Sequence, residues 1–216
     1  MSNKQEDFWS GEFGQEYTDR NFLTTEQWEQ YYKDCYGITR LEMNEKFVGS
    51  FPKDIRILEV GCNIGMQLRG LKQMGFQNLY GIEIQHKAVE MSKEVCPGAN
   101  VIQGSAFDLP FKSSFFDVVV TNGVLIHIAP ENHRTFMKEV HRCSSKFIWG
   151  FEYFNEETVE INYRANEGFL WKADFARIYR DFFTDLTLTK EEKYPYIKEV
   201  ESGNTDVMFL LEKIEQ

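Results

Sequence analysis

Two glycines in one turn and an acid further along the chain have the spacing of a ligand site. Gly61 and Gly65 follow the mostly apolar run 55–60. Glycine lets the backbone turn sharply and approach a ligand closely. Glu83 ends the next apolar run, 22 residues beyond Gly61, and an acid at about that offset accepts hydrogen bonds from both hydroxyls of a ribose. Together they predict an adenosine site, although a plain strand-to-helix turn and a solvated acid would explain each feature separately.

The glycine spacing distinguishes between cofactors. A G-x-G-x-x-G motif that starts at Gly61 needs glycines at positions 63 and 66, which hold Asn63 and Met66. Without them the backbone amides that cradle the pyrophosphate of NAD or FAD are obstructed. S-adenosylmethionine (SAM) carries no phosphate and needs only close approach at the turn. The sequence therefore favours SAM and leaves a nucleotide-dependent oxidoreductase as the alternative.

The strands and helices that position these residues can be predicted from alternating patterns in the sequence. Short strands alternating with helices indicate a mostly parallel sheet with right-handed crossovers. Two later strand-like runs predict an antiparallel pair at the edge. We therefore expect an α/β fold, a doubly wound, seven-stranded, mostly parallel sheet with an antiparallel C-terminal edge strand. The strands are expected at 55–60, 78–84, 99–103, 116–121, 146–151, 186–190 and 206–213, and the helices at 65–74, 86–95, 130–142 and 172–183.

The first fifty residues differ from the rest of the chain. They are polar, aromatic and periodic, and they predict one helix over residues 25–47, which the sequence Phe51-Pro52-Lys53-Asp54 ends. We expect residues 1–50 to form a helical lid on a SAM-binding domain of residues 51–216. At 216 residues, the two parts together suit one domain.

Five features follow one another in the chain: Glu59-Val60-Gly61-x-x-x-Gly65, Glu83, Gly104-Ser105-Ala106-Phe107-Asp108-Leu109-Pro110-Phe111, Phe116-Asp117-Val118-Val119 and Asn122-Gly123-Val124-Leu125. In this order, over about residues 55–151, they resemble the class I SAM-dependent methyltransferases. Near its start the chain reads Phe8-Trp9-Ser10-Gly11-Glu12-Phe13-Gly14-Gln15-Glu16-Tyr17-Thr18-Asp19-Arg20-Asn21. This segment is similar to the opening of the methylases associated with pseudaminic acid biosynthesis. That second resemblance implies a sugar or nucleotide sugar of the nonulosonic acid pathway as acceptor.

The first resemblance implies where SAM is bound. The glycine turn faces the methionine and ribose portions, Glu83 the ribose, and Asn122 the sulfonium. Asn63 stands where many members have glycine. Ser105 stands where an acid often meets the adenine amine, which leaves adenine to the backbone and Asp108. The expected cofactor residues are Tyr17, Arg20, Glu59, Gly61, Cys62, Asn63, Gly65, Glu83, Ile84, Gly104, Ser105, Ala106, Asn122 and Gly123.

Methyl transfer from a sulfonium requires alignment, exclusion of water and, for a hydroxyl acceptor, removal of a proton. His127, just beyond the fourth strand, is the best candidate base because imidazole titrates near neutral pH; packing or orienting a loop is the alternative role. Glu152, after the fifth strand, is the second candidate, or it hydrogen-bonds the acceptor.

The lid and the loops should enclose the acceptor. Tyr17 and Arg20 are expected to close over SAM, with Arg20 on its carboxylate; a surface helix with a solvated arginine is the other interpretation. Aromatic faces with a few polar groups suit a sugar-like or small polar molecule. Arg164 and Lys172 face a carboxylate or phosphate on it, or are ordinary surface charges. The expected substrate residues are Phe8, Trp9, Tyr153, Tyr163, Arg164 and Trp171, beside Tyr17 and Glu152.

Composition limits the partners. The formal net charge of −10 disfavours nucleic acid, which draws on Lys/Arg patches. Four scattered cysteines, no apolar leader and no run of roughly 20 apolar residues predict a cytoplasmic protein without a membrane span. The histidines form no ligand cluster, so no metal is expected. The charged stretches 190–193 and 199–201 are expected to be solvated. A SAM-binding protein without catalysis is the third functional hypothesis, and the oligomeric state is left open.

Overall fold

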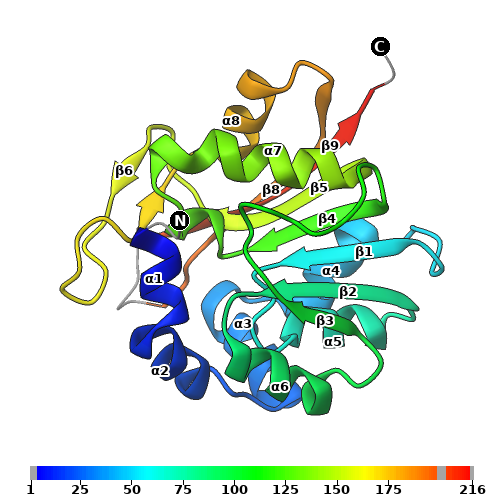
Figure 1. The fold of residues 1–216 in the computed structure, drawn as a ribbon, viewed down its shortest axis with the longest axis horizontal. Coiled ribbons are helices and arrows are strands. Elements are labelled where there is room, and N and C mark those ends of the chain that lie inside the picture. Colours follow the sequence, from blue (N-terminus) through cyan, green and yellow to red (C-terminus); the bar gives the residue numbers. More distant parts are fainter. Residues whose placement is uncertain (1–3, 199–202, 215–216) are drawn as a thin grey trace.

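A seven-stranded sheet forms the centre of the computed structural model, which describes residues 4–198 and 203–214. The strand order is β3-β2-β1-β4-β5-β9-β8 (Figure 1). The first five strands are parallel, and β9 runs antiparallel to both of its neighbours. The strands are β1 (Arg56–Val60), β2 (Asn78–Glu83), β3 (Asn100–Gln103), β4 (Phe116–Asn122), β5 (Ser144–Tyr153), β8 (Leu186–Pro195) and β9 (Thr205–Lys213).

This topology confirms the expected fold class. The chain builds β1, β2 and β3 outward and then returns to place β4 on the other side of β1, so the order reverses between β1 and β4. In an open α/β sheet, ligands bind beyond the carboxyl ends of the strands at such a reversal. The reversed strand, β9, lies between β5 and β8, so the last strand in the sequence is not the last in the sheet.

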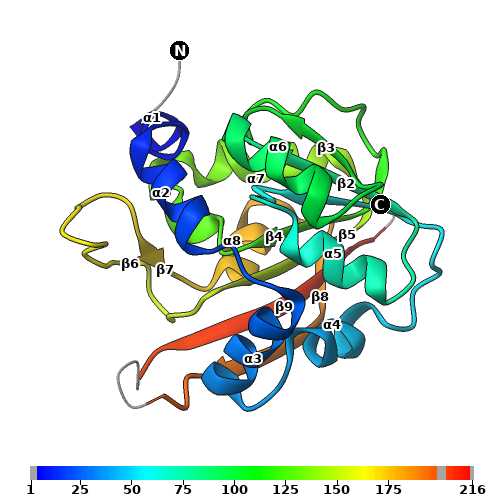
Figure 2. The ribbon, with the colours of Figure 1, turned by 90° about the horizontal axis from the view of Figure 1, so that it is seen from below.

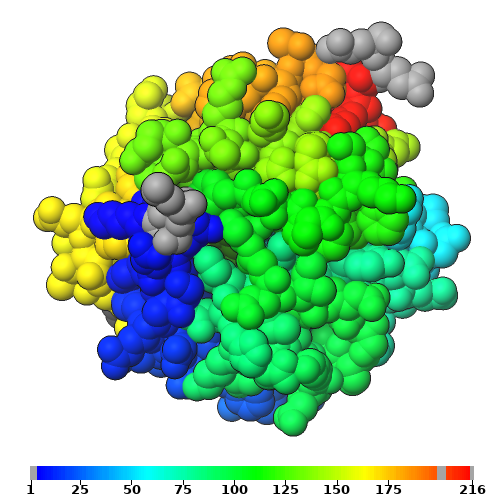
Figure 3. All heavy atoms as spheres, in the orientation of Figure 1, coloured from blue at the N-terminus to red at the C-terminus, as the bar shows by residue number. Residues whose placement is uncertain are grey.

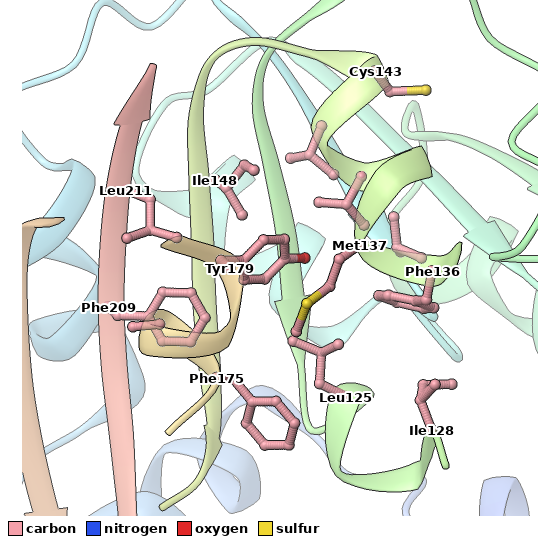
Figure 4. Close-up of a cluster of buried hydrophobic side chains, with 14 of the residues drawn as sticks. Leu125, Ile128, Phe136, Met137, Cys143, Ile148, Phe175, Tyr179, Phe209 and Leu211 are labelled. Carbon is pink, nitrogen blue, oxygen red and sulfur yellow. The ribbon is translucent and has the colours of Figure 1, made fainter. Parts of the chain in front are cut away.

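Alternating strand residues build a separate core on each face of the sheet. Leu58, Val119 and Ile148 belong to one cluster, whereas Ile57 and Trp149 belong to the other. Figure 4 shows the first cluster, in which side chains of α7 (His133–Cys143) and α8 (Phe175–Phe182) face β5 and β9. Helices α3 (Thr25–Tyr36), α4 (Arg40–Val48) and α5 (Met66–Gln73) contribute to the second. Because strand side chains alternate between faces, both faces must be covered.

The prediction of a single helix over residues 25–47 was wrong, because α3 and α4 are separate helices. Gly37 ends α3 in the left-handed conformation at φ 75°. Thr39 then caps α4, and Glu42 completes a capping box. A left-handed glycine followed by a capping threonine both stops and restarts a helix. Ahead of α3 lie α1 (Lys4–Ser10) and α2 (Glu12–Arg20).

Some further elements differ from the expected ones. The hairpin of β6 (Val159–Glu160) and β7 (Trp171–Lys172) was not expected, and α1 and α2 lie beside it (Figures 1 and 2). Residues 130–132 form a short 3-10 turn, η2, before α7 begins. Residues 190–193 lie within the edge strand β8, whereas 199–201 fall outside the described residues. The other elements are α6 (His86–Val95) and the 3-10 turn η1 (Leu125–His127).

Candidate active site

A cavity of about 640 Å³ opens at the carboxyl ends of the central strands. Its volume lies within the roughly 300–1,000 Å³ typical of small-molecule sites. Residues from the ends of β1, β2, β4 and β5 line it, together with α1–α3 and the first residues of β9. The cavity therefore occupies the place where the sheet topology predicts a ligand.

The glycine turn after β1 holds Glu83 directly. The backbone amide of Asn63 donates to Oε2 of Glu83 at 2.9 Å, and the amide of Gln85 donates to Oε1 at 2.8 Å. Burial raises the pKa of Glu83, and these amide hydrogen bonds oppose that shift. A carboxylate oxygen accepts more than one hydrogen bond. Glu83 is thus fixed in place and can still accept from two hydroxyl groups.

Gly61 leaves no room for a side chain. Its φ is +70°, and a Cβ built there would lie 2.7 Å from Cγ2 of Val124. Asn63 also has a positive φ, 46°, which asparagine tolerates better than most residues. The missing glycine at position 63 therefore does not prevent the turn from forming.

Glu59 is buried beneath the turn. Its side chain is 3% exposed, and Oε2 has no hydrogen-bond partner. Burial raises its pKa to about 8, which the nearby Arg40 opposes. Arg40 is itself fully buried, donates from Nε to Gln67 at 3.1 Å and lies 4.3 Å from the ring centre of Phe151. Glu59 therefore presents an acceptor at the methionine end expected for SAM.

His127 has a defined tautomer. Its Nδ1 lies 2.7 Å from the carbonyl oxygen of Phe169, and because a carbonyl can only accept, Nδ1 carries the proton. Nε2 of the neutral ring is then a free acceptor. The rings of Trp9 and Tyr163 lie 4.5 and 5.1 Å away between centroids. Burial lowers the pKa of His127 to about 4, so the ring is neutral at physiological pH.

Glu152 supports the loop that carries His127. It accepts from the backbone amides of Val124 at 3.3 Å and Ile126 at 3.4 Å. Burial raises its pKa to about 7. The side chain also lines the cavity. The geometry thus gives Glu152 a loop-holding role that was not foreseen, beside the expected role at the acceptor.

The N-terminal helices connect the two sides of the cavity. Gln85 donates its side-chain amide to the carbonyls of Trp9 and Gly11, the second at 3.0 Å. Phe8 stacks on Phe169 at 3.9 Å. Figure 3 shows the blue N-terminal segment in contact with the yellow segment around β6 and β7. Residues 4–20 thus span from the β2 side to the β6–β7 hairpin.

Most of the expected site residues surround this cavity. Eighteen of them line it: Trp9, Tyr17, Arg20, Glu59, Gly61, Cys62, Asn63, Glu83, Ile84, Gly104, Ala106, Asn122, Gly123, His127, Glu152, Tyr153, Tyr163 and Arg164.

Four expected residues do not line the cavity. Gly65 caps α5 and faces Cys96 and Ser92. Phe8 stacks between other rings, and Trp171 is buried in β7. Ser105 hydrogen-bonds Glu6 instead of facing the cavity. The structure thus places these four residues outside the cavity lining, and their direct contact with a ligand stays a prediction.

Asp108 and Lys172 also lie outside the lining, and Lys172 bonds Asn204. Arg20 lines the cavity but forms an exposed ion pair with Glu16 at 3.3 Å. Its expected contact with a carboxylate therefore competes with an existing partner.

The sequence interpretation missed several lining residues. Gln85 directly follows the second strand and was within reach of the same reasoning that selected Glu83. Nothing local marked the others, which come from α1, from α3 and from the final hairpin. They are Glu6, Tyr32, Tyr36, Tyr196 and Asp206.

The central segment of the chain matches a known protein family. The sequence model described as "Methyltransferase domain" matches residues 58–146. That segment contains the glycine turn, Glu83 and His127. Over these residues the chain is similar to methyltransferase domains.

Two curated relatives match the same region. An uncharacterized methyltransferase of Synechocystis is 32% identical over 87 residues, which cover 40% of this chain and 41% of the relative. The tRNA (carboxymethyluridine(34)-5-O)-methyltransferase of Arabidopsis thaliana is 32% identical over 88 residues, 41% of this chain and 20% of that protein. The chain thus spans less than half the length of these relatives.

Solved structures share the fold at low identity. The PH0226 protein of Pyrococcus horikoshii has a TM-score of 0.62 at 19% identity and covers 81% of this chain and 90% of its own. A SAM-dependent methyltransferase of Methanosarcina mazei has a TM-score of 0.59 at 15% identity, with 77% and 95% covered. These two likenesses show the shared fold. Among the described residues, no helix is long and apolar enough to cross a membrane.

Proposed function

We propose that this protein is a SAM-dependent methyltransferase that acts on a small polar molecule. The observation that carries the proposal is Glu83, held by the amides of Asn63 and Gln85 beside a turn in which Gly61 has no room for a side chain. The methyltransferase domain match supports the reaction class. A donor of methyl groups bound there would lie across the carboxyl ends of β1 and β4, next to His127.

The lining residues fit the chemical groups of SAM. Bound SAM supplies an activated methyl group on a sulfonium. Glu83 would accept from its ribose hydroxyls, and the unpartnered Oε2 of Glu59 would accept from its amino group. Gly61, which has no room for a side chain beside Val124, would let the ligand approach the backbone of the turn. Ile84 and Ala106 would lie against the adenine.

His127 is the proposed general base. Its Nε2 is unprotonated because Nδ1 is bound to Phe169, and the rings of Trp9 and Tyr163 lie beside the imidazole. Nε2 would take the proton that a hydroxyl or amine acceptor loses. Glu152 is the alternative base, and the pH dependence of the two residues separates them.

The narrower proposal is a sugar or nucleotide sugar of the nonulosonic acid pathway as acceptor. It depends on the similarity of residues 8–21 to the methylases associated with pseudaminic acid biosynthesis. Incubation with methyl-labelled SAM and a panel of nucleotide sugars and nonulosonates, followed by mass spectrometry, tests it. We expect one labelled sugar product. Labelling of unrelated small molecules with every sugar unmodified contradicts the pathway assignment but leaves methyl transfer intact.

Two alternatives follow from the fold. A [4+2]-cyclase, SpnF, has a TM-score of 0.65 to this chain at 12% identity, so the fold alone does not determine the reaction. A SAM-binding protein without catalysis would bind S-adenosylhomocysteine (SAH) and methylate nothing. A nucleotide-dependent oxidoreductase would bind NADH and not SAH.

A cytoplasmic location is part of the proposal, in line with four free, buried cysteines.

A further inference from the structure

Asp206 lies on the acceptor side of the cavity. It is paired in register with Tyr153 at the end of β5, and it lines the cavity. In the order β2-β1-β4-β5-β9, its strand is four positions from the strand that ends in Glu83. At about 4.8 Å per strand this is a separation of roughly 19 Å between the two strands. A cofactor whose ribose is bound at Glu83 would thus leave the Asp206 end for the acceptor.

The carboxylate of Asp206 is only half satisfied. Its Oδ2 accepts from the hydroxyls of Tyr36 and Tyr196, the second at 3.2 Å. Its Oδ1 has no hydrogen-bond partner, and the residue is 3% exposed. An unpaired polar oxygen in a buried site is costly. A ligand with an N–H donor would satisfy it.

Aromatic rings surround this carboxylate. Tyr36 and Tyr196 meet at 4.8 Å between ring centroids, and Tyr153 lies 6.3 Å from Tyr196. Phe151 lies 5.9 Å from Tyr36. Ring faces attract cations, and a carboxylate among them provides the opposite charge. This combination is the chemistry that recognises an amino group in its protonated form.

The cations already nearby do not take this position. Arg40 and Lys172 are close enough to influence Asp206 electrostatically. However, Arg40 bonds Gln67 and packs on Phe151, while Lys172 bonds Asn204. Neither is hydrogen-bonded to Oδ1.

The cavity lining holds more acidic than basic side chains. Its acidic residues are Glu6, Glu59, Glu83, Glu152 and Asp206, against the guanidinium groups of Arg20 and Arg164. Burial raises the pKa of Glu59 to about 8, so that carboxyl is mostly neutral at pH 7, and Arg20 is already paired with Glu16. The lining therefore leaves little net attraction for an anion.

We propose that Asp206, with Tyr36 and Tyr196, binds an amino group of the acceptor, so that the substrate carries a free amine whatever its other groups are. This inference rests on the proposed function and narrows it. It selects, from any panel of sugars or other small molecules, the members that carry a free amino group.

The test is a calorimetric titration of the SAH-loaded protein with matched probes. One series is 2-phenylethylamine, 2-phenylethanol and 3-phenylpropanoate, and the other is glucosamine, glucose and glucuronate. We expect the amine of at least one series to bind about tenfold or more tightly than its hydroxyl analogue, because a charge-assisted hydrogen bond is added. Carboxylates should bind most weakly.

Variants assign the preference to Asp206. Asp206→Asn should reduce amine binding about tenfold and leave the hydroxyl analogue unchanged, because it removes the charge and keeps the shape. Glu212→Gln, on the same strand but outside the cavity lining, is the matched control. If Asp206→Asn does not fold, Tyr196→Leu tests the aromatic part and should also weaken amine binding. The comparison of amine and hydroxyl probes on the wild-type protein does not depend on whether a variant folds.

Each result has one meaning. An amine preference that Asp206→Asn removes supports the inference. No amine tighter than its hydroxyl analogue, including no binding at all, overturns it, as does an unchanged preference in Asp206→Asn. Because SAH binding is measured first, its absence would reject the proposed function, whereas SAH binding without an amine preference rejects only this inference.

Discussion

The backbone amide of Asn63 and the carboxylate of Glu83 are joined by a 2.9 Å hydrogen bond, which ties the turn after β1 to the end of β2. The amides of Gly61 and Cys62 both donate to the carbonyl of Ile82, at 2.8 and 3.2 Å. The turn and the acid are therefore one rigid unit. A ligand that contacts both would meet groups already in position, which lowers the cost of binding.

Gly61→Ala should weaken SAH binding and lower the free energy of unfolding by about 1–3 kcal/mol, since it combines a strained positive φ with overpacking. The added Cβ would lie 2.7 Å from Val124. Calorimetry and denaturant unfolding measure the two effects. Gly203→Ala is the control, because Gly203 has φ +93° but open space around it. Equal effects of the two substitutions would show that contact with Val124 is unimportant.

Gln85→Ala should loosen the N-terminal helices over the cavity. It removes the side-chain hydrogen bonds to Trp9 and Gly11, each worth about 1 kcal/mol. We expect SAH to dissociate several-fold faster and the amides of α1 to exchange faster with deuterium. Asn78→Ala removes a comparable bond, to the carbonyl of Asp54, between two residues that do not line the cavity, and should change neither. Unaltered α1 exchange in Gln85→Ala would contradict the role of a lid.

Glu59→Gln should change how stability depends on pH. The pKa of Glu59 rises to about 8 on folding, from an ordinary value of about 4.3 in the unfolded chain. A raised pKa stabilises the folded state fully below the unfolded value, and that contribution is lost as pH rises through about 8. The wild type should therefore lose stability between about pH 5 and 8, and Glu59→Gln less so. Denaturant unfolding across this range measures the free energy of unfolding of each protein, with Glu94→Gln, at an exposed site, as the control. If the wild type and Glu59→Gln lose stability in parallel, the pKa of Glu59 is not raised by folding.

His127→Gln should lower turnover by about 10²–10⁴-fold, the usual contribution of a general base, and leave SAH affinity unchanged. Ionisation of the acceptor changes the rates of the wild type and the variant equally, so the ratio of the two rates reports the enzyme's base alone. Because the base must be unprotonated and burial lowers its pKa to about 4, this ratio should be flat above about pH 5 and fall toward pH 4.

Glu152 gives a different profile. Its pKa is raised to about 7 by burial, so a ratio of wild type to Glu152→Gln that falls below pH 7 would assign the base to Glu152 instead. His133→Gln is the matched control, since His133 is buried, bonds the carbonyl of Ile128 and does not line the cavity. A similar loss of turnover in His133→Gln would reduce His127 to a packing role.

The fold was predictable because its signals are local. β-branched runs separated by helices determine a parallel sheet, and the position of Gly61 at the end of the first strand then places the ligand crevice. The break between α3 and α4 was missed although Gly37 and Thr39 are local signals, because the aromatic periodicity continues through them.

The far side of the cavity was not predictable from the sequence. Asp206 is the second residue of the last strand and accepts a hydrogen bond from Tyr36 of α3, 170 residues earlier. No periodicity brings those residues together; only the insertion of β9 beside β5 does. For the same reason Phe8 and Trp171 were assigned to the ligand from their residue type, whereas tertiary packing places Phe8 against Phe169 and buries Trp171.

Titration of the purified protein with SAH, run in parallel with Glu83→Ala, Glu94→Ala and NADH, shows whether Glu83 binds an adenosine cofactor. We expect SAH to bind the wild type and Glu94→Ala equally. We expect Glu83→Ala to lose about 2–4 kcal/mol of binding free energy, because two hydrogen bonds to a charged group disappear, and NADH not to bind. Equal SAH affinity in Glu83→Ala, or binding of NADH in place of SAH, would contradict this role of Glu83.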